Sequence, residues 1–62
     1  MKYDEFSERE VGIIREDARE AIDALKAIIA ECNSEYVSRR YLQEKVEKAK
    51  WCIAYIRDMV QE

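Results

Sequence analysis

The sequence of 62 residues has no proline, no histidine and a single glycine. Proline and glycine interrupt helices and mark turns, so this chain has few places where a helix must stop. No stretch approaches the roughly 20 apolar residues of a membrane span, and no apolar signal region begins the chain. With 40% charged residues, this composition predicts a single all-α domain over residues 1–62, soluble and cytoplasmic.

The chain also lacks an excess of basic residues, since 11 Lys and Arg stand against 14 Asp and Glu, a net charge of −3. Affinity for long nucleic acids and for anionic membranes comes mostly from cations that neutralise phosphate. The charge therefore argues against both partners. A small anion held by a local group of arginines is still compatible with it.

The absence of histidine removes the commonest general base, and the three serines have no side chain to activate them. Acidic residues alternate with lysine and arginine at helical spacings, as expected of a solvated helix face rather than a buried carboxylate pair. Without histidine and without a Cys-x-x-Cys motif, a transition-metal site is not expected. We predict a protein that is not an enzyme, with no catalytic residue, metal or cofactor.

A capping box begins the first predicted helix, because Ser7 is followed three residues later by Glu10. Phe6 and Val11 take the positions of a hydrophobic staple, so the helix is expected over about 8–32. Its apolar residues alternate at spacings of three and four, which is a heptad seam. The seam contains Val11, Ile14, Ala18, Ala21, Leu25, Ile28 and Cys32, and Ile22 and Ile29 broaden it.

The second predicted helix covers about 39–61, with Ser38 as its N-cap. Its seam has the same alternation and contains Leu42, Val46, Ala49, Ile53, Ile56 and Val60. Asn33 is expected to end the first helix because asparagine tolerates the left-handed conformation. The short loop, 33–37, favours an antiparallel two-helix hairpin.

Two helices cannot cover two broad seams, so the hairpin is predicted to assemble into a helical-bundle homo-oligomer, a dimer at least and possibly a hexamer. In this hairpin Cys32 lies near the turn and Cys52 roughly 20 Å away, beyond disulfide reach. Both are expected to be reduced, packed thiols.

Several residues have no function in the predicted core. Tyr41, Trp51 and Tyr55 lie on the face of the second helix opposite its seam, where large aromatics favour an oligomer contact, although ligand stacking or plain surface are alternatives. Arg39 and Arg40 oppose the dipole of the helix that they begin. They either pair with acidic residues of the turn or form a phosphate site with the helix N–H groups.

Gly12 costs roughly 1 kcal/mol in a helix relative to alanine. It shares a face with Arg15 and Arg19, so that its missing side chain leaves a notch beside two cations. This notch is explained either by close helix packing or surface variation, or by a ligand that approaches there. Tyr3, which precedes the staple, has no local structural role.

The segments "YDEFSEREV" and "RRYLQEKVEKAKWCIAYI" resemble the phage-encoded anti-CBASS sponge proteins, a helical-hairpin family related to some anti-Thoeris sponges. In that family too, an aromatic residue precedes a capped first helix, and an Arg-aromatic-Leu step begins the last one. The resemblance covers nearly the whole chain.

The resemblance implies a homo-oligomer, hexameric in the best-known members, that binds cyclic oligonucleotide signals between protomers without cleaving them in the infected bacterial host. The family's aromatic before the first helix stacks on a nucleobase, and Tyr3 takes the matching place. The family's basic contact falls at Ala18, so either Arg19 replaces it or the ligand differs, as with an ADP-ribose-type signal. The ligand site expected from the residues and the resemblance together contains Tyr3, Phe6, Gly12, Arg15, Arg19, Arg39 and Arg40.

A different class of function is also compatible with the sequence. A homo-oligomeric bundle that acts as a protein-interaction module, natural or designed, has the same heptads, with Trp51 and Tyr55 as its contact surface. Such a module has no need of Gly12, the two arginines at 39 and 40, or Tyr3.

Overall fold

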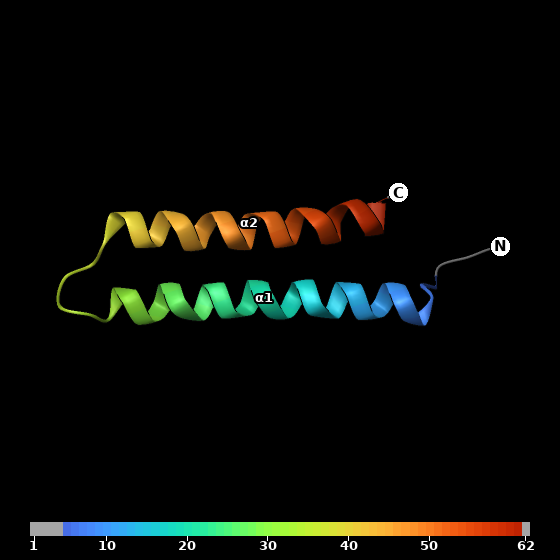
Figure 1. Cartoon of the computed structure of the whole chain (residues 1–62), viewed down its shortest axis with the longest axis horizontal. Helices are drawn as coiled ribbons and strands as arrows, with labels where there is room; N and C mark the ends of the chain where they lie inside the picture. The colour runs from blue at the N-terminus through green and yellow to red at the C-terminus, as the bar shows by residue number, and fades with distance from the viewer. Residues whose placement is uncertain (1–4, 62) are drawn as a thin grey trace.

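The computed structural model describes residues 5–61, which form two helices and the turn between them. α1 covers Glu8–Cys32 and α2 covers Arg39–Gln61. The helices lie side by side and antiparallel, so the beginning of α1 and the end of α2 lie at the same end of the molecule (Figure 1). The predicted all-α hairpin is confirmed.

The beginning of α1 has the geometry that the capping box requires. The backbone N–H of Glu10 donates to the Ser7 hydroxyl at 3.2 Å, and the backbone N–H of Ser7 donates to the Glu10 carboxylate at 2.9 Å. Two N–H groups without a helical partner are thereby satisfied. Glu8 and Glu10 also place negative charge in the first turn, where the helix dipole favours it.

α1 ends at Asn33, although not in the way that the sequence predicts. Asn33 has φ −89° and ψ −2°, which is right-handed backbone, and no described residue has a positive φ. The expected left-handed cap is therefore wrong. The N–H of Asn33 reaches the carbonyls of Ile29 and Ala30, and Ser34 donates from both its N–H and its hydroxyl to the Glu31 carbonyl.

The beginning of α2 is capped from two sides. The N–H of Tyr41 donates to the Ser38 hydroxyl at 3.1 Å, as the sequence predicts. In addition, the Glu31 carboxylate accepts the backbone N–H of Ser38 at 2.8 Å, which joins the end of α1 to the start of α2. This second contact links residues seven apart and is not evident from any capping motif.

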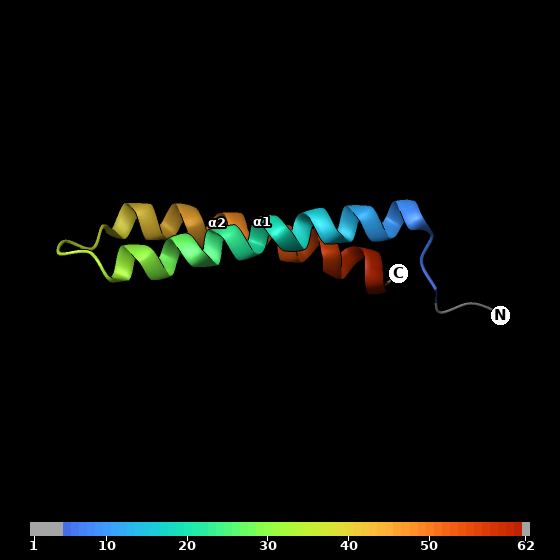
Figure 2. The ribbon, with the colours of Figure 1, turned by 90° about the horizontal axis from the view of Figure 1, so that it is seen from below.

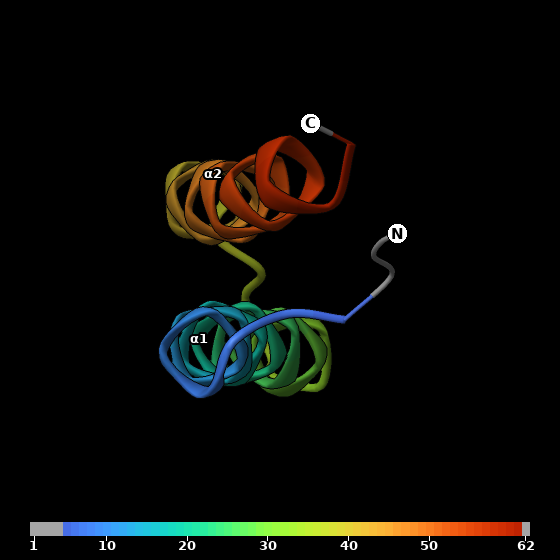
Figure 3. The same ribbon diagram turned by 90° about the vertical axis from the view of Figure 1, so that its right-hand side faces the viewer.

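The two helices approach each other through small side chains. The buried residues are Ala21, Ala24, Ala49 and Cys52. Figure 2 shows the ribbons crossing at a shallow angle, and Figure 3 shows them from the end as two adjacent coils. No described side chain of large volume is fully buried, so the core of a single hairpin is narrow.

The predicted seams coincide with this contact line only in part, since Ala21 and Ala49 belong to the seams and are buried. Leu25, Val46 and Ile53 belong to the seams, yet each is at least half exposed, whereas Ala24 and Cys52 lie outside the seams and are buried. The physical reason is that a heptad seam faces the centre of a bundle of several helices, while two helices touch along one side of that seam only.

Both cysteines are free thiols, as predicted. Cys52 is buried between the helices, in agreement with the prediction of a packed thiol. Cys32 is exposed at the end of α1, so the same prediction is wrong there for a single hairpin.

The two edges of the hairpin differ in chemistry. On one edge, the Glu20 carboxylate lies 3.8 Å from the Lys48 ammonium, beside Asp23 and Lys45. On the other, Leu25 of α1 lines one groove with Val46 and Ile53 of α2. We call the exposed apolar residues on this side the apolar face; they are Val11, Ile22, Leu25, Ile29, Val46, Ile53 and Val60. Neither α1 nor α2 is long and apolar enough to cross a membrane.

Candidate functional site

A hollow of about 380 Å³ lies at the beginning of α1. Phe6, Glu8, Val11 and Arg15 line it. The capping box sets the direction of the chain here and so places the ring of Phe6 beside the first turns of the helix. The hollow therefore combines an aromatic surface with a guanidinium. Tyr3, which the resemblance assigns to base stacking, lies outside the described residues.

Gly12 and Arg19 belong to the same half of α1 but do not line this hollow. A Cβ atom built on Gly12 meets nothing within 4 Å, so the glycine is not required by close packing against another part of the hairpin. Arg19 is exposed. The notch beside two cations that the sequence predicts is therefore open surface in the single chain.

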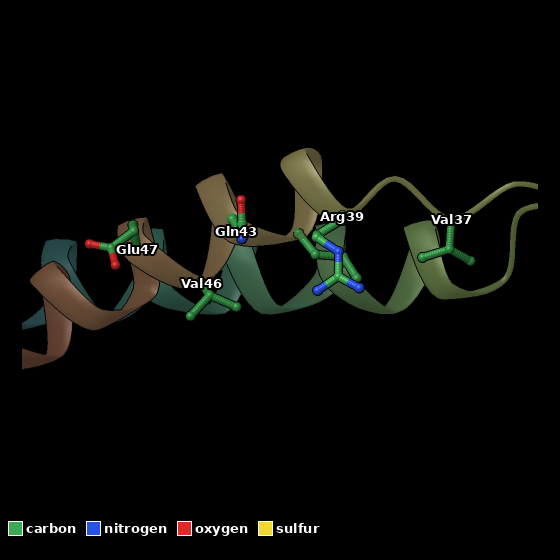
Figure 4. A pocket seen from close by; sticks show the side chains of 6 residues that line it. Val37, Arg39, Gln43, Val46 and Glu47 are labelled. Atoms are coloured by element: carbon green, nitrogen blue, oxygen red, sulfur yellow. The ribbon is translucent and has the colours of Figure 1, made fainter.

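A second, larger groove of about 730 Å³ lies at the turn end of the molecule. Its lining is mostly from the first three turns of α2 and contains Val37, Arg39, Leu42, Gln43, Val46 and Glu47. In the close view of Figure 4, the Arg39 guanidinium and the Val46 side chain point to the same side of the helix, and the Glu47 carboxylate lies at the far end.

Within residues 5–61, neither Arg39 nor Arg40 lies within 4 Å of a carboxylate oxygen. The interpretation that these arginines pair with acidic residues of the turn is thus wrong for the described chain. The Glu31 carboxylate instead accepts the backbone N–H of Ser38. Of the two, Arg39 lines the groove and Arg40 does not.

A third groove, of about 630 Å³, follows the middle of the apolar face. Leu25 and Ile28 of α1 form one wall, and the residues of α2 that line it include Trp51, Lys50 and Arg57. Sequence reasoning missed Lys50 and Arg57. Both lie next to the second seam and are seven residues apart, a spacing that would have placed them on one flank of the helix.

The aromatic residues of α2 lie on its outer side. The rings of Trp51 and Tyr55 have centroids 6.4 Å apart and are tilted by 37°, and each residue is 56% exposed. The Lys45 ammonium lies 5.3 Å from the centroid of Tyr41. Trp51 is the aromatic of this group that lines the middle groove.

The structure does not bring all predicted ligand-binding residues together. Arg15 lies near the start of α1, whereas Arg39 lies beside its end. Since a helix rises 1.5 Å per residue, the two arginines are about 25 Å apart along the hairpin. The arginines thus form two groups, Arg15 with Arg19 on α1 and Arg39 with Arg40 on α2. Of the other predicted residues, Phe6 shares a hollow with Arg15, whereas Gly12 lines none of the three.

The described residues contain no group of three or more His, Cys, Asp or Glu side chains that would hold a metal ion. One titratable group has a distinct environment. Burial raises the pKa of the Cys52 thiol, and the nearby carboxylates of Glu20 and Asp17 raise it further. The Cys52 thiol donates to the Glu20 carboxylate at 3.8 Å, which stabilises its neutral form.

In comparisons with known proteins, no family model matches this chain, and neither a curated protein nor a solved structure is significantly similar to it.

Proposed function

We propose that this protein is a phage anti-defence protein that binds a nucleotide second messenger and holds it without cleavage. The ligand class is a cyclic di- or trinucleotide or an ADP-ribose-type signal, bound between protomers of a homo-oligomer in the cytoplasm of an infected bacterial cell. The observation that carries this proposal is the composition of the hollows, each of which places an apolar or aromatic wall beside a cation.

This composition matches the chemistry of a nucleotide. A base gains roughly 1–3 kcal/mol from stacking on an aromatic side chain. A phosphate forms charge-assisted, often bidentate, hydrogen bonds with a guanidinium. Phe6 with Arg15, and Trp51 with Arg57, offer both elements within one hollow. Within residues 5–61, Arg15 and Arg39 have no carboxylate within 4 Å, so their charge is available to a phosphate.

Two features support a site that lies between protomers. Each hollow is open on the surface of a single chain, and those at the two ends of the hairpin are lined almost entirely from one helix and its flanking residue. The two groups of arginines are also about 25 Å apart, so a ligand that contacts both groups must bridge different copies. The homo-oligomer is thus part of the proposal and not an addition to it.

The absence of turnover is supported by the side chains available. The chain has no histidine, and the hollows contain no nucleophile beside a general base. Binding without cleavage requires only affinity for the nucleotide, which arginine and aromatic side chains provide.

The proposal is tested by titration calorimetry of the purified protein against cyclic di- and trinucleotides and ADP-ribose conjugates. We expect nanomolar binding of one of them, and recovery of the intact ligand after heat denaturation. Tyr3→Ala and Arg15→Ala are each expected to weaken binding at least tenfold and to leave the oligomer intact. Lys26→Ala, which removes an exposed cation that lines none of the three hollows, is the matched control. No binding across the panel contradicts the proposal.

A second candidate function is a protein-interaction module. It is favoured by the half-exposed pair of Trp51 and Tyr55 on the outer side of α2, because Trp and Tyr contribute most to protein contacts. If the nucleotide panel gives no binding, Trp51→Ala compared with the wild-type chain in affinity capture tests this alternative. An unchanged set of captured proteins would argue against it.

A further inference from the structure

We infer that the apolar face is covered by a second copy of this chain in a four-helix bundle, and that anions tighten this assembly because it places Arg57 against a cation of the partner subunit. The inference rests on the homo-oligomer of the proposed function and specifies its contact surface and its electrostatic control.

The core of a single hairpin is small. Ala21, Ala24, Ala49 and Cys52 are the buried residues of the hairpin, and small side chains bury little apolar area. Full burial of a leucine or isoleucine contributes about 1.5–3 kcal/mol, and seven larger apolar residues stay exposed on one side. The folded hairpin is therefore expected to bury its apolar face against another chain. A second copy is the one chain that is always present at equal concentration.

The chain also exposes more surface than a compact protein of its mass. A compact monomer of 7.4 kDa exposes about 4200 Å² by the usual scaling with mass, whereas this chain exposes 5392 Å². The surplus of about 1200 Å² exceeds the roughly 800 Å² per partner of a stable protein interface. The surface in excess of a compact protein is thus large enough to supply one partner's share of a stable interface.

The apolar residues that face the partner repeat with the same period on both helices. Along the seams, Ile14, Ala21 and Ile28 repeat every seven residues and are half-buried or buried in the hairpin. Val11, Ala18 and Leu25 repeat with the same period one step further round α1, and Val46, Ile53 and Val60 do so on α2. Because both rows keep one period, a second copy meets this face with apolar residues at matching heights.

The charged residues beside the apolar face explain why anions tighten the dimer. Beside the apolar row, the flank of α2 contains Gln43, Lys50 and Arg57, and that of α1 contains Glu8, Arg15, Ile22 and Ile29, each at spacings of seven. Glu8 is one heptad, about 10 Å, from Arg15 along α1. With both turns at one end of the dimer, α1 packs on α2 and Arg15 meets Arg57 of the partner subunit. With the turns at opposite ends, α2 packs on α2 and Lys50 meets Arg57 of the partner subunit. Like charges therefore meet at Arg57 in either orientation.

Within the chain, Arg57 has one exposed ion pair, to Asp58 at 3.5 Å. Such a pair contributes little, and repulsion between flank residues costs a few tenths of a kcal/mol per pair. Apolar burial exceeds this cost, so the dimer forms. Phosphate or another anion that binds between the facing cations strengthens it.

Sedimentation equilibrium of the full chain at low salt tests both parts. We expect a reversible dimer, tightened by inorganic phosphate more than by chloride of equal ionic strength. Arg57→Glu converts two repulsive contacts into attractive ones, so its dissociation constant falls about tenfold at low salt, and this gain disappears in 1 M NaCl. Arg9→Glu, the same charge change at an exposed residue that lines none of the hollows, is expected to have little effect.

Leu25→Glu is expected to prevent assembly, whereas Ile13→Glu, which places the same charge at an exposed isoleucine outside the apolar face, preserves it. A folded wild-type monomer at 100 μM would overturn the inference, and so would weaker assembly of Arg57→Glu. These measurements contain no nucleotide. A failure of the proposed function in calorimetry therefore leaves them unaffected. An oligomer that binds nucleotide but assembles through another face, as intact assembly of Leu25→Glu would show, refutes this inference alone.

Discussion

At the scale of single residues, Gly12 destabilises α1 although no packing contact within the hairpin requires a glycine there. It lies inside α1, and a Cβ atom at this position meets nothing within 4 Å. We expect Gly12→Ala to raise the free energy of unfolding by about 0.5–1 kcal/mol, because alanine favours the helix and restricts the unfolded chain. Urea denaturation at a fixed protein concentration measures it.

The reverse change, Ala30→Gly at another exposed position of α1, is the control and is expected to lower stability by a similar amount. If Gly12→Ala instead loses stability or ligand affinity, another molecule approaches the backbone at this glycine.

Cys52 gives the protein a pH dependence that can be measured at one residue. Burial raises the pKa of its thiol, so the folded chain holds the neutral form. Below the ordinary thiol pKa of about 8.5, both states are neutral and this group leaves stability unchanged. Above it, the unfolded chain ionises first, and stability falls until the folded thiol ionises too.

We therefore expect the melting temperature to fall as the pH rises from 8 to 10, and to fall less in Cys52→Ala. Cys32→Ala, which removes an exposed thiol, is expected to follow the wild-type profile. Parallel profiles for wild type and Cys52→Ala would contradict the assigned environment.

At the scale of elements, the contact between Glu31 and Ser38 connects the two helices. The carboxylate near the end of α1 accepts an N–H that precedes α2, at 2.8 Å. Glu31→Ala leaves this N–H without its partner and is expected to cost about 1 kcal/mol, as the loss of a capping side chain does.

Thermal unfolding followed by circular dichroism measures this cost. Glu35→Ala is the matched control, since it removes a carboxylate from the same turn without a hydrogen bond or ion pair within residues 5–61. An equal effect of both substitutions would mean that the charge of the turn matters, and not the hydrogen bond.

At the scale of the whole molecule, the hairpin divides its apolar residues between two tasks. Small residues bring α1 and α2 together, and the large ones of the apolar face are left on one side. Cations on that side are seven residues apart and line the same groove. We therefore expect folding, assembly and anion binding to be linked. Leu25→Glu tests the contribution of the apolar face to assembly, and Arg57→Glu tests the contribution of charge.

The sequence by itself determined the helices and their ends. The capping box at Ser7 and the cap at Ser38 act over three residues, and such short-range hydrogen bonds can be recognised from residue type and spacing alone. The short segment between the caps likewise predicted antiparallel neighbours.

Only the tertiary structure decided which side of each seam the other helix covers. A heptad seam is symmetric about the centre of a bundle, so periodicity does not state that Ala24 and Cys52 are buried while Leu25 and Ile53 remain exposed. The same holds for the candidate site. The arginines were found by residue type, but only the packing of α1 on α2 places Leu25 and Ile28 in one groove with Trp51, Lys50 and Arg57.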